Sequence, residues 1–215
     1  IACNLAKIAR QTNKKFIHIS TDHLFSGENS LVNENEIPTP LNVYAKTKND
    51  AEICVVKENS NALVVRTNFY GCGHKNRQSF SDWIIKSLTD GKNIVAFDDV
   101  YFTPILIDDL ISSVTSLIEI NASGIINIVG NERISKYKFA IALAEVFDLD
   151  KNLIEKGSVK DIDSNAERPK DMSLSNQKLI QLIDYKPHNL IPALKLLKEQ
   201  FIAGRSKILD ESLVS

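Results

Sequence analysis

Two residues with acid–base chemistry, Tyr44 and Lys48, lie four positions apart in the stretch "PLNVYAKTKNDAE". On an α-helix this spacing places both side chains on one face, a single turn apart, where they can reach a common point. A lysine ammonium beside a phenol stabilises the phenolate and makes the phenol a better proton donor at neutral pH. The pair therefore predicts a proton donor, Tyr44, tuned by Lys48.

Two hydroxyl residues, Ser20 and Thr21, precede this pair in the stretch "STDHLFSG", directly after the apolar run "FIHIS". A hydroxyl at the carboxyl end of a strand can donate a hydrogen bond to a substrate carbonyl and hold it for proton delivery. Together with Tyr44 and Lys48, such a hydroxyl would allow protonation of an alkoxide as hydride arrives at carbon. The alternative interpretation of the tyrosine–lysine pair is an ordinary solvated helix face.

Other residues with reactive or metal-binding side chains fit structural roles. His18 and His23 have no third ligand at metal-binding spacing, so we expect a strand residue and a loop residue, and no metal site. Trp83 is expected in the core or in a pocket wall. Paired aspartates before a helix are typical caps and first-turn acids, and four residues fit this role: Asp98, Asp99, Asp108 and Asp109.

The elements that must position these residues alternate between short apolar strands and amphipathic helices. Strands are predicted at 16–20, 62–67, 93–97 and 124–130, and helices at 1–15, 42–58, 79–91, 106–120, 136–147 and 189–204. Ser135 is the expected N-cap of one helix, and Pro192 fits the first turn of another. Residues 156–173 are predicted as a surface loop and 205–215 as a fraying tail. The alternation predicts a parallel sheet with helices on both faces and ligands at the carboxyl ends of its strands.

Composition narrows the class of protein. The 215 residues have near-average apolar and charged content, and the net charge of -1 disfavours nucleic acid or an anionic membrane as partner. No apolar run reaches membrane-spanning length. The cysteines are odd in number and lack CxxC spacing, so we expect no disulfide framework and a reducing, cytoplasmic location; they are Cys3, Cys54 and Cys72. A homodimer is left open.

Four stretches in order along the whole chain carry a family resemblance: "STDHLFSG", "PLNVYAKTK" followed by "AE", "RTNFYG" and "ERPKDMSLSNQKL". This series resembles the extended short-chain dehydrogenase/reductase family, and within it the dTDP-4-dehydrorhamnose reductases. The resemblance implies an α/β fold, a Rossmann-like doubly wound parallel sheet with a small C-terminal α/β substrate lobe. It implies one NAD(P)-binding reductase domain over 1–215, with 68–105 and 130–205 contributing the substrate lobe.

The resemblance also implies an activity, the reduction of the 4-keto group of a nucleotide-activated deoxysugar by NADPH or NADH, as in dTDP-rhamnose and cell-surface polysaccharide biosynthesis. Thr21 would orient the keto group, Tyr44 would donate the proton and Lys48 would also hold the nicotinamide ribose. By the same resemblance, the residues facing the cofactor are Ser20, Thr21, Tyr44, Lys48, Thr67 and Asn68. Those facing the nucleotide-sugar substrate are Asp22, Phe69 and Arg168.

Two features depart from the family pattern. None of the eight glycines forms the glycine-rich loop that binds a dinucleotide pyrophosphate. We therefore expect the missing units to precede Ile1, the strand at 16–20 to expose apolar surface, and the chain alone to bind NAD(P)H poorly. The pair Tyr101–Phe102 also differs from the Gly-Ala or Arg-Ala pair of rhamnose reductases. A non-catalytic sugar-nucleotide-binding or regulatory subunit, or a nucleotide-sugar epimerase or dehydratase, stays an alternative.

Overall fold

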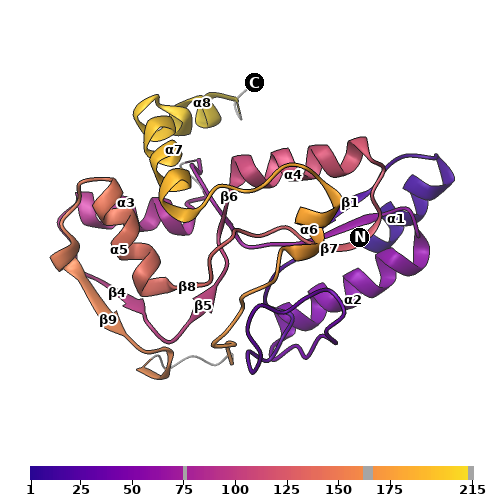
Figure 1. Cartoon of the computed structure of the whole chain (residues 1–215), viewed down its shortest axis with the longest axis horizontal. Coiled ribbons are helices and arrows are strands. Elements are labelled where there is room, and N and C mark those ends of the chain that lie inside the picture. Colours follow the sequence, from indigo (N-terminus) through magenta and orange to yellow (C-terminus); the bar gives the residue numbers. More distant parts are fainter. Residues whose placement is uncertain (75–76, 162–166, 213–215) are drawn as a thin grey trace.

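A three-stranded parallel sheet of order β1-β2-β7 lies at the centre of one half of the molecule (Figure 1). The computed structural model describes residues 1–74, 77–161 and 167–212. In the sheet, Ile17 pairs with Leu63, and Leu63 pairs with Gly124. The strands are β1 (Ile17–Ile19), β2 (Leu63–Arg66) and β7 (Gly124–Asn127).

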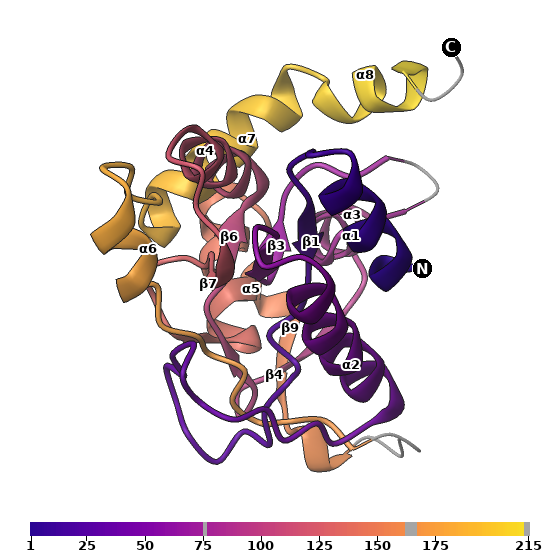
Figure 2. The ribbon, with the colours of Figure 1, turned by 90° about the vertical axis from the view of Figure 1, so that its right-hand side faces the viewer.

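Helices cover both faces of this sheet, with α1 and α2 on one side and α4 and α6 on the other (Figures 1 and 2). Successive residues of β2 point to opposite faces. Val64 packs with Ala6 and Val55 on one face, whereas Leu63 and Val65 pack into a second cluster under α4 and α6. The helices are α1 (Ala2–Gln11), α2 (Val43–Glu58), α4 (Ile107–Glu119) and α6 (Gln177–Leu182). The predicted doubly wound α/β architecture is confirmed.

A second core lies beside the sheet, where α3, α5 and α7 pack around Phe139, Leu143 and Leu194. Strand β4 pairs in parallel with β9 along this core, and two short pairs, β3-β6 (parallel) and β5-β8 (antiparallel), complete the strands described. The helices are α3 (Phe80–Thr89), α5 (Lys136–Val146) and α7 (Leu190–Ile202). The strands are β3 (Phe69–Tyr70), β4 (Ile94–Phe97), β5 (Tyr101–Phe102), β6 (Ile105–Leu106), β8 (Ile134–Ser135) and β9 (Ile154–Gly157).

Local sequence signals explain where these helices begin. The Ser79 side chain accepts a hydrogen bond from the Asp82 backbone N–H at 3.1 Å, and the Asp82 carboxylate accepts one from the Ser79 N–H at 2.9 Å. This capping box satisfies two backbone donors at the start of α3. Ser135 caps α5 by accepting from the Lys138 N–H at 3.2 Å, as predicted.

Two predictions about the polar segments are wrong in part. Helix α8 (Arg205–Ser212) forms where a fraying tail was expected, and residues 213–215 lie outside the described residues. An ion pair of 2.7 Å between Arg205 and Asp108 attaches this helix to α4, a contact that no local pattern could reveal. The predicted loop at 156–173 includes the end of β9 and a 3-10 turn at Val159–Asp161, and its residues 162–166 also lie outside the described part.

The expectation about cysteines is contradicted. Cys3 on α1 and Cys54 on α2 form a disulfide, with their Cα atoms 5.5 Å apart. The two residues are 51 positions apart in the chain, so only the packing of α1 on α2 brings them together. Cys72 is free, and burial raises the pKa of its thiol.

Strands β1 and β7 are the edges of this sheet among the described strands, and Ile19 on β1 is 40% exposed. No helix in the described part of the chain is long and apolar enough to cross a membrane.

Candidate functional site

The predicted hydroxyl and carboxylate residues meet at the carboxyl ends of β1 and β2. Asn68 Nδ2, after β2, donates a hydrogen bond of 2.6 Å to Asp22 Oδ2, after β1. Thr21 Oγ1 donates to the other carboxylate oxygen at 3.3 Å. Asp22 is only 2% exposed, and burial raises the pKa of its carboxyl group. The two loops are joined because parallel neighbouring strands end at the same edge of the sheet.

Helix α2 brings the tyrosine and the lysine to this edge. Asn42 caps it by accepting from the Ala45 N–H at 2.9 Å, which places Tyr44 in the first turn and Lys48 one turn later. Lys48 Nζ donates a hydrogen bond of 3.0 Å to the carbonyl oxygen of Ile19, the last residue of β1. Tyr44 is 54% exposed, so its phenol is accessible to a ligand.

A buried ion pair fixes the position of α2 on the sheet. Glu52 follows Lys48 by one further turn, and its carboxylate accepts hydrogen bonds from Arg66 Nε at 3.1 Å and Nη2 at 2.7 Å. Arg66 is the last residue of β2. The helix face that carries Tyr44 and Lys48 is therefore tied directly to the strand end that leads to Asn68.

The residues predicted to face the cofactor fit the nicotinamide end of that group. The hydroxyls of Ser20 and Thr67 are buried at the strand ends and have no hydrogen-bond partner among the described residues. These groups lie near the edge that Tyr44 and Lys48 reach, whereas the chain offers no glycine-rich loop for a pyrophosphate. The residues present thus fit the reactive end of NAD(P)H and not its phosphates.

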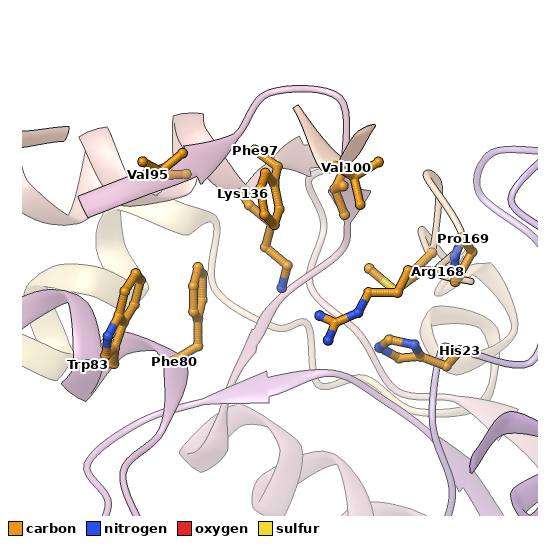
Figure 3. Close-up of a pocket in the computed structure, with 12 residues that line it drawn as sticks. His23, Phe80, Trp83, Val95, Phe97, Val100, Lys136, Arg168 and Pro169 are labelled. Atoms are coloured by element: carbon orange, nitrogen blue, oxygen red, sulfur yellow. The ribbon is translucent and has the colours of Figure 1, made fainter. Parts of the chain in front are cut away.

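A cavity of about 390 Å³ opens beside this edge (Figure 3). Its described lining residues all fall within 68–105 and 130–205, except His23 from the loop after β1. One wall is aromatic, with the Phe80 and Trp83 rings stacked at 6.0 Å. The lining residues are His23, Phe80, Trp83, Val95, Ala96, Phe97, Val100, Lys136, Val159, Arg168, Pro169 and Met172.

Arg168, the predicted substrate residue farthest along the chain, reaches this cavity (Figure 3). Asn42 Nδ2 donates a hydrogen bond of 3.0 Å to the carbonyl oxygen of Glu167, so the segment carrying Arg168 is held at the start of α2. Phe69, in contrast, is not among the described residues that line the cavity. The structure therefore holds the segment of Arg168 at the start of α2. The described lining of the cavity includes neither Phe69 nor the candidates Thr21, Tyr44 and Lys48.

Two cavity residues were not predicted as functional. Lys136 opens α5, and its Nζ lies 3.4 Å from the centre of the Phe102 ring and 4.6 Å from that of Phe80. Burial lowers the pKa of Lys136 to about 8, and the nearby carboxylate of Asp22 opposes this shift. The sequence signal that bears on Lys136 is the Ser135 cap, which predicts that a helix begins at residue 136. His23, expected to be a plain loop residue, also lines the cavity.

The paired aspartates have structural partners, although not all are caps. Asp108 and Asp109 lie in the first turn of α4, as predicted. Asp109 is buried and accepts hydrogen bonds from the backbone and ring nitrogens of His188. Asp98 accepts from the Oγ of Ser135, the N-cap of α5, at 2.9 Å, and Asp99 accepts from Ser158 Oγ at 2.7 Å, so neither carboxylate is itself a helix cap here.

The chain belongs to the RmlD substrate binding domain family, whose sequence pattern matches residues 1–202. The resemblance to dTDP-4-dehydrorhamnose reductases is thereby confirmed. The dTDP-4-dehydrorhamnose reductase of Bacillus anthracis, solved in complex with NADP, shares the Rossmann-like fold with a TM-score of 0.84. It is 23% identical, and the alignment covers 91% of this chain and 69% of that chain.

Two further relatives are more similar to this chain in sequence than that reductase. The probable low-salt glycan biosynthesis reductase Agl14 of Haloferax volcanii is 28% identical over 171 residues, which cover 78% of this chain and 57% of that protein. Methionine adenosyltransferase 2 subunit beta of Rattus norvegicus is 31% identical over 195 residues, which cover 82% of this chain and 54% of that protein. The chain thus spans little more than half the length of these relatives.

Proposed function

We propose that the protein reduces the 4-keto group of a nucleotide-activated deoxysugar with NADPH or NADH, as the name of its dTDP-4-dehydrorhamnose reductase neighbour suggests. The observation that carries the proposal is that the tyrosine–lysine face of α2 lies against the end of β1. Lys48 Nζ donates to the carbonyl oxygen of Ile19, two residues before Thr21, and the Tyr44 ring meets that of His23, two residues after it. A protein that only binds a sugar nucleotide does not need a proton-donating phenol and a lysine ammonium close to a threonine hydroxyl. The membership in a family with reductase relatives supports the same activity.

The bound nicotinamide would supply hydride to the carbonyl carbon. When substrate binds, the single hydroxyl hydrogen of Thr21 turns from Asp22 to the carbonyl oxygen and holds the ketone in place. Tyr44 donates a proton to that oxygen as negative charge develops on it, and the Lys48 ammonium stabilises the phenolate that results. Ser20, Thr67 and Asn68 shape the strand ends on the cofactor side, and Asp22 holds Asn68 in place by accepting its hydrogen bond.

The cavity suits the nucleotide part of the substrate. Arg168 and Lys136 bring positive charge toward its interior, which favours a diphosphate. The flat faces of Phe80 and Trp83 offer a stacking surface for a base. In this proposal the segments 68–105 and 130–205 act as the substrate lobe, while the β1 and β2 loops and α2 provide the reacting groups.

The test is oxidation of NADPH and of NADH by the intact protein that carries this chain, followed by absorbance with dTDP-4-keto-6-deoxy-L-mannose. We expect Tyr44→Phe to lower kcat by about 10²–10⁴-fold, the usual contribution of a general acid. Tyr137→Phe is the matched control, because it removes a phenol from α5 outside the cavity lining, and it should keep wild-type turnover. Equal turnover of Tyr44→Phe and the wild type would overturn the role of Tyr44.

A second candidate is a sugar-nucleotide-binding subunit without catalysis. The similarity to methionine adenosyltransferase 2 subunit beta favours it, since that relative is named as a subunit. Tight binding of the sugar nucleotide by both the wild type and Tyr44→Phe, with no cofactor oxidation by either, would support this second function.

A further inference from the structure

His23 lies next to two of the groups that the proposed reduction uses, Thr21 and Tyr44. Its ring meets the Tyr44 ring edge-on, with the centroids 5.9 Å apart. Its backbone N–H donates a hydrogen bond of 3.3 Å to Thr21 Oγ1, and its Nε2 lies 3.9 Å from Asp22 Oδ1. The side chain remains 30% exposed and faces the cavity (Figure 3).

This inference rests on the proposed function, which determines where the ketone binds. A carbonyl oxygen that accepts hydrogen bonds from Thr21 and Tyr44 lies beside His23, because His23 contacts both residues. The carbons next to that carbonyl are one bond further away, and their hydrogens are acidic because the electron pair left behind passes to the carbonyl oxygen. An imidazole at this place is the side chain most often used to abstract a proton at neutral pH.

We propose that His23 is the base of a second activity at this site, the reversible removal of a proton from a carbon next to the keto group. The C–H bond breaks and the proton goes to the imidazole, while the electron pair forms a C=C bond and the carbonyl oxygen becomes an enolate. Return of the proton restores the ketone, so no oxidant or reductant is consumed. The substrate is the class of enolisable nucleotide-activated keto sugar.

The surroundings of His23 stabilise such an enolate. Thr21 and Tyr44 donate hydrogen bonds to the oxygen that gains negative charge. Lys136 and Arg168 enter the same cavity from other elements, and no described residue of the cavity lining is an aspartate or glutamate. Outside the lining, Asp22 is buried and bound by Asn68, and Asp99 accepts the backbone N–H of the lining residue Val159. The charged side chains among the described lining residues are therefore the cations Lys136 and Arg168.

The experiment is proton exchange in D₂O with the intact protein and dTDP-4-keto-6-deoxy-L-mannose, without added NAD(P)H. Mass spectrometry measures deuterium in the recovered sugar, and NMR assigns it to the carbons beside the ketone. The same preparations are assayed for NADPH oxidation. We expect exchange above the protein-free rate, and a ratio of exchange to reduction at least tenfold lower in His23→Gln. His188→Gln, at a half-exposed histidine that contacts Asp109, is the control expected to keep both rates.

Each outcome separates this inference from the proposed reductase. Reduction without exchange above the protein-free rate overturns the role of His23 as a base and leaves the reductase intact. Exchange without reduction supports the inference and overturns the reductase. Exchange that persists unchanged in His23→Gln, or the absence of both reactions with the sugar nucleotide bound, overturns the inference.

Discussion

Breaking the buried ion pair between Glu52 and Arg66 should cost more stability than breaking an exposed pair, because it leaves a charge without a partner in the interior. Both side chains are 2% exposed, and three hydrogen bonds join them. Removing one partner of such a pair costs about 3–5 kcal/mol. For a chain of this length, 1 kcal/mol shifts Tm by roughly 2–4 °C, so Glu52→Ala should lower Tm by roughly 6–20 °C.

The assay is urea unfolding followed by circular dichroism for Glu52→Ala, Arg66→Met and Glu52→Met/Arg66→Met. We expect each single variant to lose about 3–5 kcal/mol and the double variant to lose much less, because replacing both charges by apolar groups leaves no ion stranded. Glu145→Ala is the control, since Glu145 and Lys151 form an ion pair with side chains more than half exposed. Water screens this exposed pair, so its loss should change the urea midpoint little.

A loss in Glu52→Ala no larger than that in Glu145→Ala would refute the argument that burial gives the pair its importance. Additive losses in the double variant would refute direct coupling between the two residues. A positive result would also show why α2 stays in place, since the same helix face carries Tyr44 and Lys48.

Two further predictions concern a titrating lysine and a glycine. Burial lowers the pKa of Lys136 to about 8, below the 10.5 of an exposed lysine, so the unfolded chain binds more protons between these values and the free energy of unfolding should rise with pH there. Urea unfolding across this range should show a smaller rise in Lys136→Met, and an equal rise would contradict the burial of the ammonium. A Cβ at Gly130 would overlap the carbonyl oxygen of Pro104, so Gly130→Ala should lose about 1–3 kcal/mol. An unchanged urea midpoint in Gly130→Ala would show that this backbone approach is not tight.

Much of the local structure could be predicted because the relevant signals lie within a few residues. The helix that carries Tyr44 and Lys48 begins at the Asn42 cap, and the apolar residues 63–65 form a fully buried strand. The first turn of α5 follows from Ser135. Helix α8 was missed because its anchor, the ion pair of Arg205 with Asp108, joins residues 97 positions apart.

In the candidate site, too, some features follow from local sequence signals and others depend on contacts between distant segments. The expectation that Thr21, Tyr44 and Lys48 act together came from residue types, spacing and the family resemblance, and their joint role stays a prediction. His23 and Lys136 could not be assigned from spacing, because the sequence does not show which side chains enter the cavity. Their placement depends on how the loop after β1, the start of α5 and the segment around Arg168 close around one space (Figure 3).

The sequence by itself determined the alternation of strands and helices, the shared helix face of Tyr44 and Lys48, and the resemblance to reductases, because these depend on periodicity and short motifs. Only the tertiary structure decided that Cys3 meets Cys54, that Glu52 is buried against Arg66, and that the cavity receives an imidazole and an ammonium. The physical reason is that such contacts join segments far apart in the chain. Their burial and charge exist only after the helices have packed on the sheet.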